Sequence, residues 1–280
     1  MARTYAQICD LAEQILQDTG NSVFSTTELD VFIPDALLEI SRYKPRETKE
    51  TLLTSGTNRE LTLDSANKHR LLWIDRLEYP TGYEPKEYHG FTRWGDVLDM
   101  EIDVLPEADE SVYLYLYKGH ILQKEVGTED LSGALNAAAV AGALSLDLKS
   151  LGTGTINEDT HLAITGDSTV YYVTSTVTIA ANAATVYIEP KLAAAAAEDA
   201  VVTLAVPTST LDTQLESILA KLIAGRAAIS KARNYIGAVT VGGQNTPAEL
   251  AAWGNGKVAE AMSQLRSIKK ARNYQLYSRE

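Results

Sequence analysis

Cysteine and histidine, which often carry catalysis or bind metal ions, are scarce in this chain, and their spacing predicts no metal site. The 280 residues include one cysteine and four histidines: His69, His89, His120 and His161. No two histidines have the His-x-x-x-His spacing that places two ligands on one face of a helix. A single cysteine excludes a Cys-based zinc site and an internal disulfide. We therefore predict no metal ion.

Motifs for nucleotide binding and for nucleophilic catalysis are incomplete or absent in this chain. The run Gly254-Asn255-Gly256-Lys257 lacks the Ser or Thr that follows the lysine of a phosphate-binding loop, and Gly152-Thr153-Gly154 lacks a third glycine. No Gly-x-Ser-x-Gly elbow occurs, and Cys9 falls on the apolar face of a predicted helix, where a thiol packs in a core. The sequence thus indicates no catalytic residue and no cofactor, and we expect a protein that is not an enzyme.

The composition is that of a soluble folded chain long enough for two domains. Hydrophobic residues make up 45% and charged residues 22%. There is no run of about 18 apolar residues, the length that predicts a membrane-spanning helix. The N-terminal residues lead into an amphipathic helix without the apolar core of a signal peptide. We therefore expect no membrane association and synthesis in the cytoplasm.

Charge is divided unevenly along the chain. The formal net charge is −12, but residues 211–280 hold ten Lys and Arg against five Asp and Glu, a net of +5. Residues 1–210 hold 15 against 32, a net of −17. An acidic body repels nucleic acid, while a basic C-terminal arm fits an acidic partner or a phosphate backbone. The alternative interpretation of the arm is a solvated helix face.

Capping residues and apolar spacing predict four helices. The first helix covers residues 4–19, with Gly20 as its C-terminal cap. The second starts at the Ser25-Thr26-Thr27-Glu28 capping box and ends before Pro45, and Pro34 should kink or restart it. A long third helix runs from Ser209 to near Gly237, and a last helix begins at Thr246-Pro247.

Strands are predicted between the second and third helices. They cover residues 60–63, 71–79, 96–102 and 111–117. The last strand alternates strictly, so that three tyrosines, Tyr113, Tyr115 and Tyr117, line one face while aliphatic residues line the other. Tyrosine suits protein interfaces, and we predict a subunit interface at these three residues. The competing interpretation is an ordinary half-exposed sheet face.

Residues 130–206 differ in composition from the rest of the chain. They contain no Arg, no Trp and only two lysines, Lys149 and Lys191. Strand-like runs occur at residues 145–148, 161–164, 170–173, 176–179, 185–188 and 201–205, and predict a small barrel or sandwich. The alanine-rich residues 137–143 and 193–197 are either single helical turns or linkers.

The expected fold class is therefore α+β. A helical-bundle host domain with a small β-sheet carries an inserted all-β barrel or sandwich module. The host is divided into residues 1–129 and 207–280, and residues 130–206 form the insert. Insertions of this length are tolerated because loop closure costs grow slowly and both ends leave from neighbouring points of the host.

Several host segments resemble the head-to-tail connector, or adaptor, proteins of tailed bacteriophages. The matching segments are residues 29–43, 78–80, 88–91, 94–98, 114–122 and 209–211, with Gly225-Arg226-Ala227-Ala228 similar to a small-residue turn of helix in that family. The insert, especially residues 164–171 and 186–192, looks like a β module of phage structural proteins and departs from the minimal adaptor. The resemblance covers roughly two thirds of the chain and consists of packing and turn patterns.

The resemblance implies a virion protein of the neck, made in the host cytoplasm, that forms a ring of usually twelve copies. The ring would bind the portal protein on one side and the tail or the next neck protein on the other, and double-stranded DNA would pass through it without sequence-specific binding. In such adaptors the C-terminal segment reaches the portal. This implies portal contacts at five residues: Lys269, Lys270, Arg272, Tyr274 and Tyr277.

Two other functions compete with the connector. The β insert could recognise a glycan or another virion protein, with the helices as its mount, although it lacks Trp and has only Tyr171, Tyr172 and Tyr187 for stacking on sugar rings. The basic arm could bind DNA directly, which predicts an affinity that falls steeply with salt.

Overall fold

Two N-terminal helices begin at side-chain caps. The computed structural model describes residues 2–124, 132–204, 208–235 and 247–268. Helix α1, Tyr5–Leu16, starts at Thr4, whose hydroxyl accepts the N–H of Gln7. It ends three residues earlier than predicted, because Gln17 takes a left-handed φ of 57°. The Asp18 carboxylate then accepts the backbone N–H groups of residues 22–24 and holds the chain in a loop.

The predicted capping box and proline restart are both confirmed. Helix α2, Thr26–Asp30, is capped by Ser25, and Glu28 bonds back to the Ser25 N–H. Helix α3, Ile33–Tyr43, starts afresh with a proline in its first turn. Proline is accepted there because its missing N–H has no partner at a helix start.

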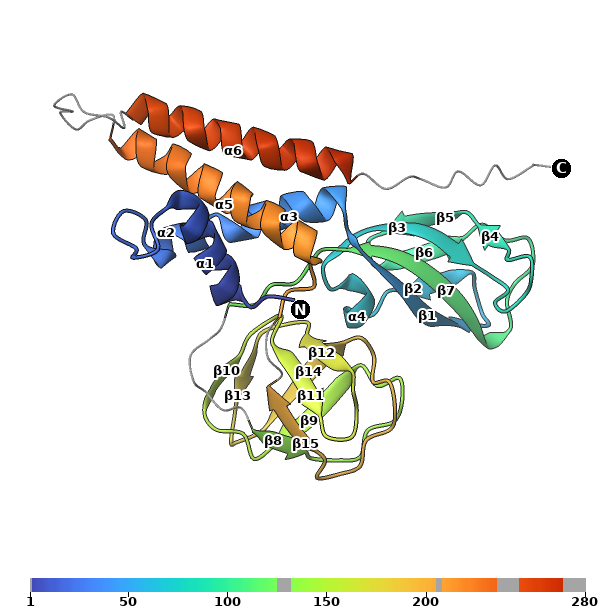
Figure 1. The fold of residues 1–280 in the computed structure, drawn as a ribbon. Helices are drawn as coiled ribbons and strands as arrows, with labels where there is room; N and C mark the ends of the chain where they lie inside the picture. Colours follow the sequence, from blue (N-terminus) through green and yellow to red (C-terminus); the bar gives the residue numbers. More distant parts are fainter. Residues whose placement is uncertain (1, 125–131, 205–207, 236–246, 269–280) are drawn as a thin grey trace. The chain divides into compact units, whose positions relative to one another are not determined.

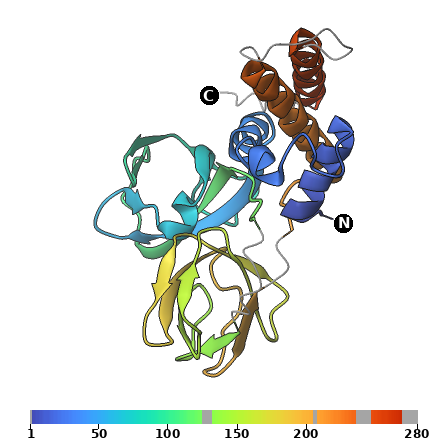
Figure 2. The same ribbon diagram turned by 90° about the vertical axis from the view of Figure 1, so that its left-hand side faces the viewer.

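The two C-terminal helices are each continuous. Helix α5, Thr213–Asn234, starts at Asp212, whose side chain accepts the N–H of Leu215. Helix α6, Pro247–Ser267, runs through Gly254 and Gly256 without interruption. Together with α1, α2 and α3 these helices form unit 1, residues 1–45 and 211–280. Helix α5 packs against α6, α1 and α3, and Figures 1 and 2 show α5 and α6 side by side.

Unit 2, residues 46–210, contains all the strands found in the described part of the chain. Its first sheet has the order β1-β7-β3-β4, and a second has the order β2-β6-β5. The strands are β1 Arg46–Ser55, β2 Glu60–Thr62, β3 Leu71–Glu78, β4 Tyr88–His89, β5 Phe91–Trp94, β6 Val97–Met100 and β7 Ala108–Lys118, with the short helix α4 Ser65–Lys68 between β2 and β3. Leucines and other apolar residues of these strands share one buried core.

Strand β1 is the main element that sequence reasoning missed. Its first half, Arg-Glu-Thr-Lys-Glu-Thr, has little strand propensity. It forms a strand because it pairs antiparallel with β7 from Arg46 opposite Lys118 to Ser55 opposite Ala108. Tertiary pairing therefore overrides local preference here.

The remaining strands form a closed six-stranded barrel with the order β11-β12-β14-β9-β8-β15. They are β8 Gly133–Leu135, β9 Ser145–Lys149, β11 His161–Ile164, β12 Val170–Val173, β14 Ala184–Glu189 and β15 Val201–Leu204. β10, Gly154–Ile156, and β13, Val177–Ile179, form a separate pair. The barrel strands, drawn as a ribbon in Figure 2, enclose a core. This core consists mainly of aliphatic side chains, together with Tyr171. The predicted fold class is confirmed as α+β with a β-barrel.

The two alanine-rich runs are not helical. Ala139 and Ala196 instead form an isolated antiparallel bridge, with an N–H to O distance of 2.9 Å in each direction. Small side chains allow the two backbones to pair outside the main strands.

The predicted insert boundaries, 129/130 and 206/207, lie among residues 125–131 and 205–207, outside the described part of the chain. The proposed division of the host into residues 1–129 and 207–280 therefore stays a prediction. Within the described residues, no helix is both long and apolar enough to cross a membrane.

Candidate functional site

The three tyrosines of β7 lie on the half-exposed face of the first sheet. Val112, Leu114 and Leu116 are buried on the opposite face, as the alternation predicted. Two further aromatic residues join the tyrosines: the Trp73 and Tyr117 rings lie 4.9 Å apart between centroids, and the Tyr88 and Tyr115 rings 6.1 Å apart. We call the set Trp73, Tyr88, Tyr113, Tyr115 and Tyr117 the tyrosine face.

Two cations lie on the tyrosine face. The Lys49 ammonium is 3.4 Å from the centroid of the Tyr113 ring, and the Arg76 guanidinium is 5.2 Å from that of Tyr88. Both positions follow from the register, because Lys49 on β1 and Arg76 on β3 are each opposite Tyr115 on β7. Such contacts contribute about 0.5–1 kcal/mol each at exposed sites. The cations therefore keep the rings in place on an otherwise open surface.

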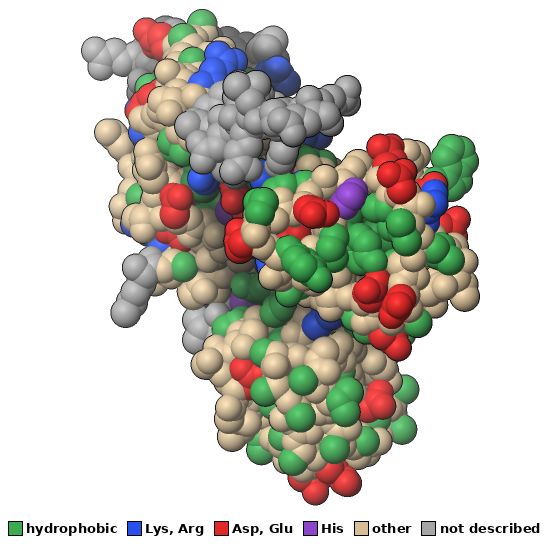
Figure 3. Space-filling view, turned by 90° about the vertical axis from the view of Figure 1, so that its right-hand side faces the viewer, with side chains coloured by type: hydrophobic (Ala, Val, Ile, Leu, Met, Phe, Trp, Pro, Cys, Tyr) green, Lys and Arg blue, Asp and Glu red, His purple; other side chains and the backbone are tan. Residues whose placement is uncertain are grey.

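A buried carboxylate supports the centre of the face. Glu78, 1% exposed, accepts a hydrogen bond from the Tyr115 hydroxyl. Burial and this hydrogen bond raise the pKa of Tyr115, so its hydroxyl stays a donor across the neutral range. On the face of the molecule drawn in Figure 3, hydrophobic side chains, a colour class that includes tyrosine, gather with acidic side chains around them.

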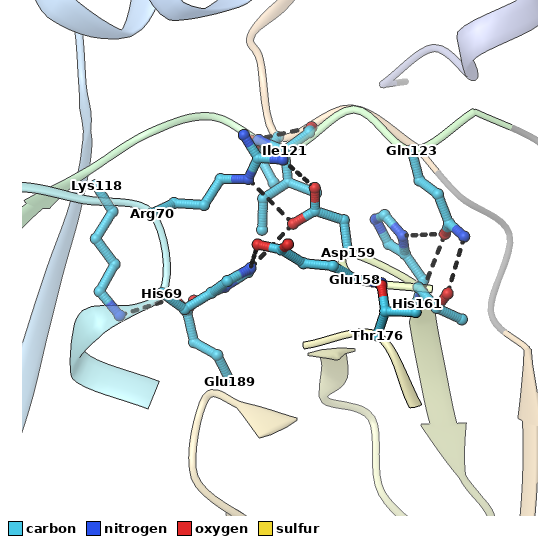
Figure 4. A network of polar contacts seen from close by, with 12 residues as sticks. His69, Arg70, Lys118, Ile121, Gln123, Glu158, Asp159, His161, Thr176 and Glu189 are labelled. Carbon is cyan, nitrogen blue, oxygen red and sulfur yellow. Dashed lines mark hydrogen bonds and ion pairs between the residues drawn. The ribbon is translucent and has the colours of Figure 1, made fainter. Parts of the chain in front are cut away.

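A second polar cluster is buried in unit 2, and His69 is at its centre (Figure 4). Its side chain is 1% exposed and lies between two carboxylates. The Nδ1 atom contacts Glu189 of β14, and Nε2 lies 3.0 Å from an oxygen of Asp159, in the loop before β11. Arg70 donates to the same Asp159 carboxylate through Nε, at 3.1 Å, and through Nη2.

The Glu189 carboxylate pairs with three cationic side chains from three separate segments of the chain. Besides the contact with His69, it accepts a hydrogen bond from Nη2 of Arg46 in β1 at 2.7 Å and pairs with Nζ of Lys118 in β7 at 3.0 Å. Lys118 also donates to the Ala66 carbonyl at 2.6 Å. Glu189 and Lys118 have side chains 1% and 0% exposed. We call His69, Arg70, Arg46, Lys118, Asp159 and Glu189 the charge network.

The charge network favours protonated His69 beside ionised carboxylates. Burial alone would lower the pKa of His69, but its hydrogen bonds to Asp159 and Glu189 outweigh burial and raise it. Burial alone would raise the pKa of Asp159 and of Glu189, yet the hydrogen bonds from His69 and the nearby cations hold both below their usual values. Burial lowers the pKa of Lys118 in spite of Glu189.

His69, Glu158 and Asp159 also place three potential metal ligands within 4.8 Å of one another. Both ring nitrogens of His69 contact carboxylates, and Arg70 neutralises Asp159. The Glu189 contact to Nδ1 could remain beside a metal ion, but the ion would have to displace Arg70 from Asp159 and the proton from Nε2 of His69. The donors as arranged here therefore fit an ion-pair network better than a metal centre.

The charge network joins residues 46–118 to the segment that forms the barrel, which runs from β8 to β15. Hydrogen bonds near the charge network also connect these two parts of unit 2. Gln123 donates to the Thr160 hydroxyl at 3.1 Å and accepts the N–H of His161 at 3.1 Å. Thr210, which follows the barrel, donates its N–H to the Ile121 carbonyl at 3.0 Å. The chain before the barrel and the chain after it therefore lie side by side, as is required for a segment inserted into a host domain.

The site residues predicted from sequence have different outcomes. Tyr113, Tyr115 and Tyr117 do share one face, but their role as a subunit interface stays a prediction. The five residues expected to contact a portal, Lys269, Lys270, Arg272, Tyr274 and Tyr277, all lie outside the described residues. The charge network was missed, since no spacing links Glu189 to His69 across 120 positions.

The chain was also compared with known proteins. It matches no protein-family model and no curated protein.

Proposed function

We propose that this chain is a structural virion protein, a head-to-tail adaptor that forms a ring between the portal vertex and the tail of a bacteriophage. The single observation that carries the proposal is the tyrosine face. It presents five aromatic side chains and two cations on one side of a sheet whose other side is core. Tyr, Trp and Arg are the residues most enriched at protein contacts.

The division of charge supports the same function. Unit 2 holds 12 Lys and Arg against 25 Asp and Glu, a net of −13, while unit 1 holds 13 against 12, a net of +1. An acidic unit would repel the phosphates of DNA passing through a ring, so that the duplex slides without binding. The basic C-terminal segment would bind an acidic surface of the portal through Lys269, Lys270, Arg272, Tyr274 and Tyr277.

The test is the mass in solution, measured by light scattering after size exclusion. Alone, we expect about the mass of one chain, 30.4 kDa. Mixed with portal rings of the same phage, we expect a stable complex with one copy per portal subunit. A chain that stays at its free mass beside intact portal rings would remove the connector function.

A specific observation favours one second candidate, a glycan-binding module. A hollow of about 430 Å³ in unit 2 is lined by Ser65, Lys68, His69, Arg70, Glu158, Thr174, Ser175 and Tyr187. Tyr187 is 46% exposed and could stack on a sugar ring beside these polar groups. Retention of the chain on a panel of immobilised bacterial glycans, lost in Tyr187→Ala, would favour this candidate. Retention unaffected by Tyr187→Ala would exclude the hollow.

A further inference from the structure

Unit 2 contains two separate hydrophobic cores. One core lies in the two sheets, and the other lies inside the barrel. Among the described residues, no side chain belongs to both cores. We call residues 46–118 the sheet lobe and residues 132–204 the barrel lobe. Each lobe therefore buries apolar side chains of its own, as a part that stays folded by itself must do.

Charged side chains join the two lobes. The sheet lobe contributes the cations of the charge network, and the barrel lobe contributes its two carboxylates, Asp159 and Glu189. A further pair has the opposite arrangement: Nζ of Lys191 in the barrel lobe lies 2.8 Å from Asp64 and donates to the Thr51 carbonyl at 3.0 Å. A contact of this polar kind resembles a transient protein interface, whose two sides can separate without unfolding.

Two adjacent residues of β14 separate this contact from the barrel core. Ile188 is 0% exposed and belongs to the core inside the barrel, while Glu189 pairs with the cations of the sheet lobe. The two side chains differ in this way because successive residues of a strand point to opposite faces. A change at Glu189 can therefore break the contact between the lobes and leave the barrel core intact.

Buried polar atoms without partners lie beside the same contact. In the described part of the chain, Nε of Arg46, Oγ1 of Thr48 and both polar side-chain atoms of Asn67 are buried without a hydrogen-bond partner in the protein. Arg46 contacts the barrel lobe through Glu189 and the Tyr172 ring, and Asn67 is on α4, which packs against β14. Burial of such atoms costs free energy, which separation of the lobes would return because water could then reach them.

We propose that the charge network is a latch, and that the barrel lobe separates from the sheet lobe as a folded body when the pairs of Glu189 are broken. The closed state gains ion pairs, but the open state regains hydration of the same charges, so opening costs less than separation of an apolar contact would. Opening exposes Lys118, whose side chain is 0% exposed in the closed state. The latch goes beyond the adaptor function and does not depend on it.

Chemical labelling of Lys118, combined with hydrogen exchange, tests the latch in the full chain. An amine-reactive reagent reports opening at Lys118, with the exposed Lys86 as internal reference, and the amides paired between β11 and β12 report whether the barrel stays folded. In Glu189→Gln we expect Lys118 to react about tenfold faster or more than in the parent protein, because three cations lose their shared carboxylate. Exchange between β11 and β12 should stay as slow as in the parent protein.

Two further variants are matched to Glu189→Gln. Glu198→Gln makes the same change at an exposed carboxylate of the barrel lobe and should alter neither readout. Ile188→Ala removes volume from the barrel core and should speed exchange in β11 and β12 without a comparable change at Lys118. The reason is that separation of the lobes, and not unfolding of the barrel, controls the exposure of that lysine.

The parent protein provides the same comparison without a substitution, and it applies equally if Glu189→Gln does not fold. In urea below the main unfolding transition, Lys118 should become reactive before the β11 and β12 amides lose their protection. Simultaneous loss of both, in urea or in Glu189→Gln, would mean that unit 2 opens only as one cooperative body and would overturn the latch. Lys118 that stays unreactive in folded Glu189→Gln would overturn it too, because this carboxylate would then not hold the lobes together.

Discussion

Gly225 of α5 and Gly254 of α6 bring their two helices into backbone contact. A Cβ on Gly225 would lie 2.8 Å from the Gly254 carbonyl oxygen, and a Cβ on Gly254 would lie 2.7 Å from the Gly225 carbonyl oxygen. Neither distance is tolerable for a methyl group, so both positions require glycine. Gly256, two residues further along, has open space around it.

Gly225→Ala should therefore force α5 and α6 apart. We expect a loss of about 1–3 kcal/mol, the usual cost of overpacking a well-packed contact. Gly256→Ala is the control in the same pair of helices and should be neutral or stabilising by up to about 1 kcal/mol, since alanine favours helix. Thermal unfolding of the three proteins gives the comparison. Equal stability of Gly225→Ala and the parent protein would contradict the close contact.

Glu189→Gln should destabilise unit 2 strongly. The substitution keeps the shape but leaves Arg46, Lys118 and His69 without their shared carboxylate. Removing one partner of a buried ion pair costs about 3–5 kcal/mol. Glu198→Gln, whose side chain is 62% exposed and pairs with Lys149 at 3.7 Å, is the control and should change stability by less than about 1 kcal/mol. Urea unfolding followed by circular dichroism measures both variants.

The charge network also predicts how stability depends on pH. The folded pKa of His69 is raised, so its contribution is complete below about pH 6.5, its value when unfolded, and is lost as the pH rises through the folded pKa. The folded pKa values of Asp159 and Glu189 are lowered, so their contributions are complete above about pH 4.3 and are lost as the pH falls through those values.

The variant His69→Gln tests the contribution of His69, which is the part of the stability that is lost as the pH rises. The free energy of unfolding should be lower in the variant than in the parent protein, and this difference should be larger at about pH 6 than at about pH 9.5. The reason is that the parent protein itself loses the His69 contribution as the pH rises between these values. The difference between the two proteins is the useful quantity, since burial lowers the pKa of His161 and gives that residue the opposite dependence. A difference independent of pH would mean that His69 is not charged in the network.

Removal of residues 269–280 should abolish portal binding and leave the folded units unchanged. The segment holds four of the ten basic residues after position 210. The full chain should bind free duplex DNA weakly, with little dependence on salt, because its net charge of −12 repels the phosphates and few of them are neutralised. Portal pull-down and DNA titration at two salt concentrations check the two parts. Strong, salt-sensitive DNA binding by the full chain would instead favour direct DNA recognition.

Local patterns in the sequence predicted most elements of the fold. Ser25 and Glu28 marked a helix start correctly, and residues 161–164 and 170–173 match β11 and β12. Capping and alternation depend on side chains within a few positions of one another, which one sequence displays directly. The same reasoning placed Tyr113, Tyr115 and Tyr117 on one face.

Patterns that depend on distant partners were not predictable in this way. The charged first half of β1 became a strand only because β7 pairs with it, and the alanine-rich runs paired with each other instead of forming helical turns. Local propensity was overridden in each case by hydrogen bonds between segments far apart in the chain.

The sequence by itself determined the fold class, the division of charge and the row of tyrosines, since these follow from composition and spacing. Only the tertiary structure decided that Gly225 meets Gly254 and that Glu189 balances Arg46, Lys118 and His69. Close approach of two helices and neutralisation of a buried carboxylate both require groups that packing brings together from segments far apart in the chain, and no local pattern encodes them.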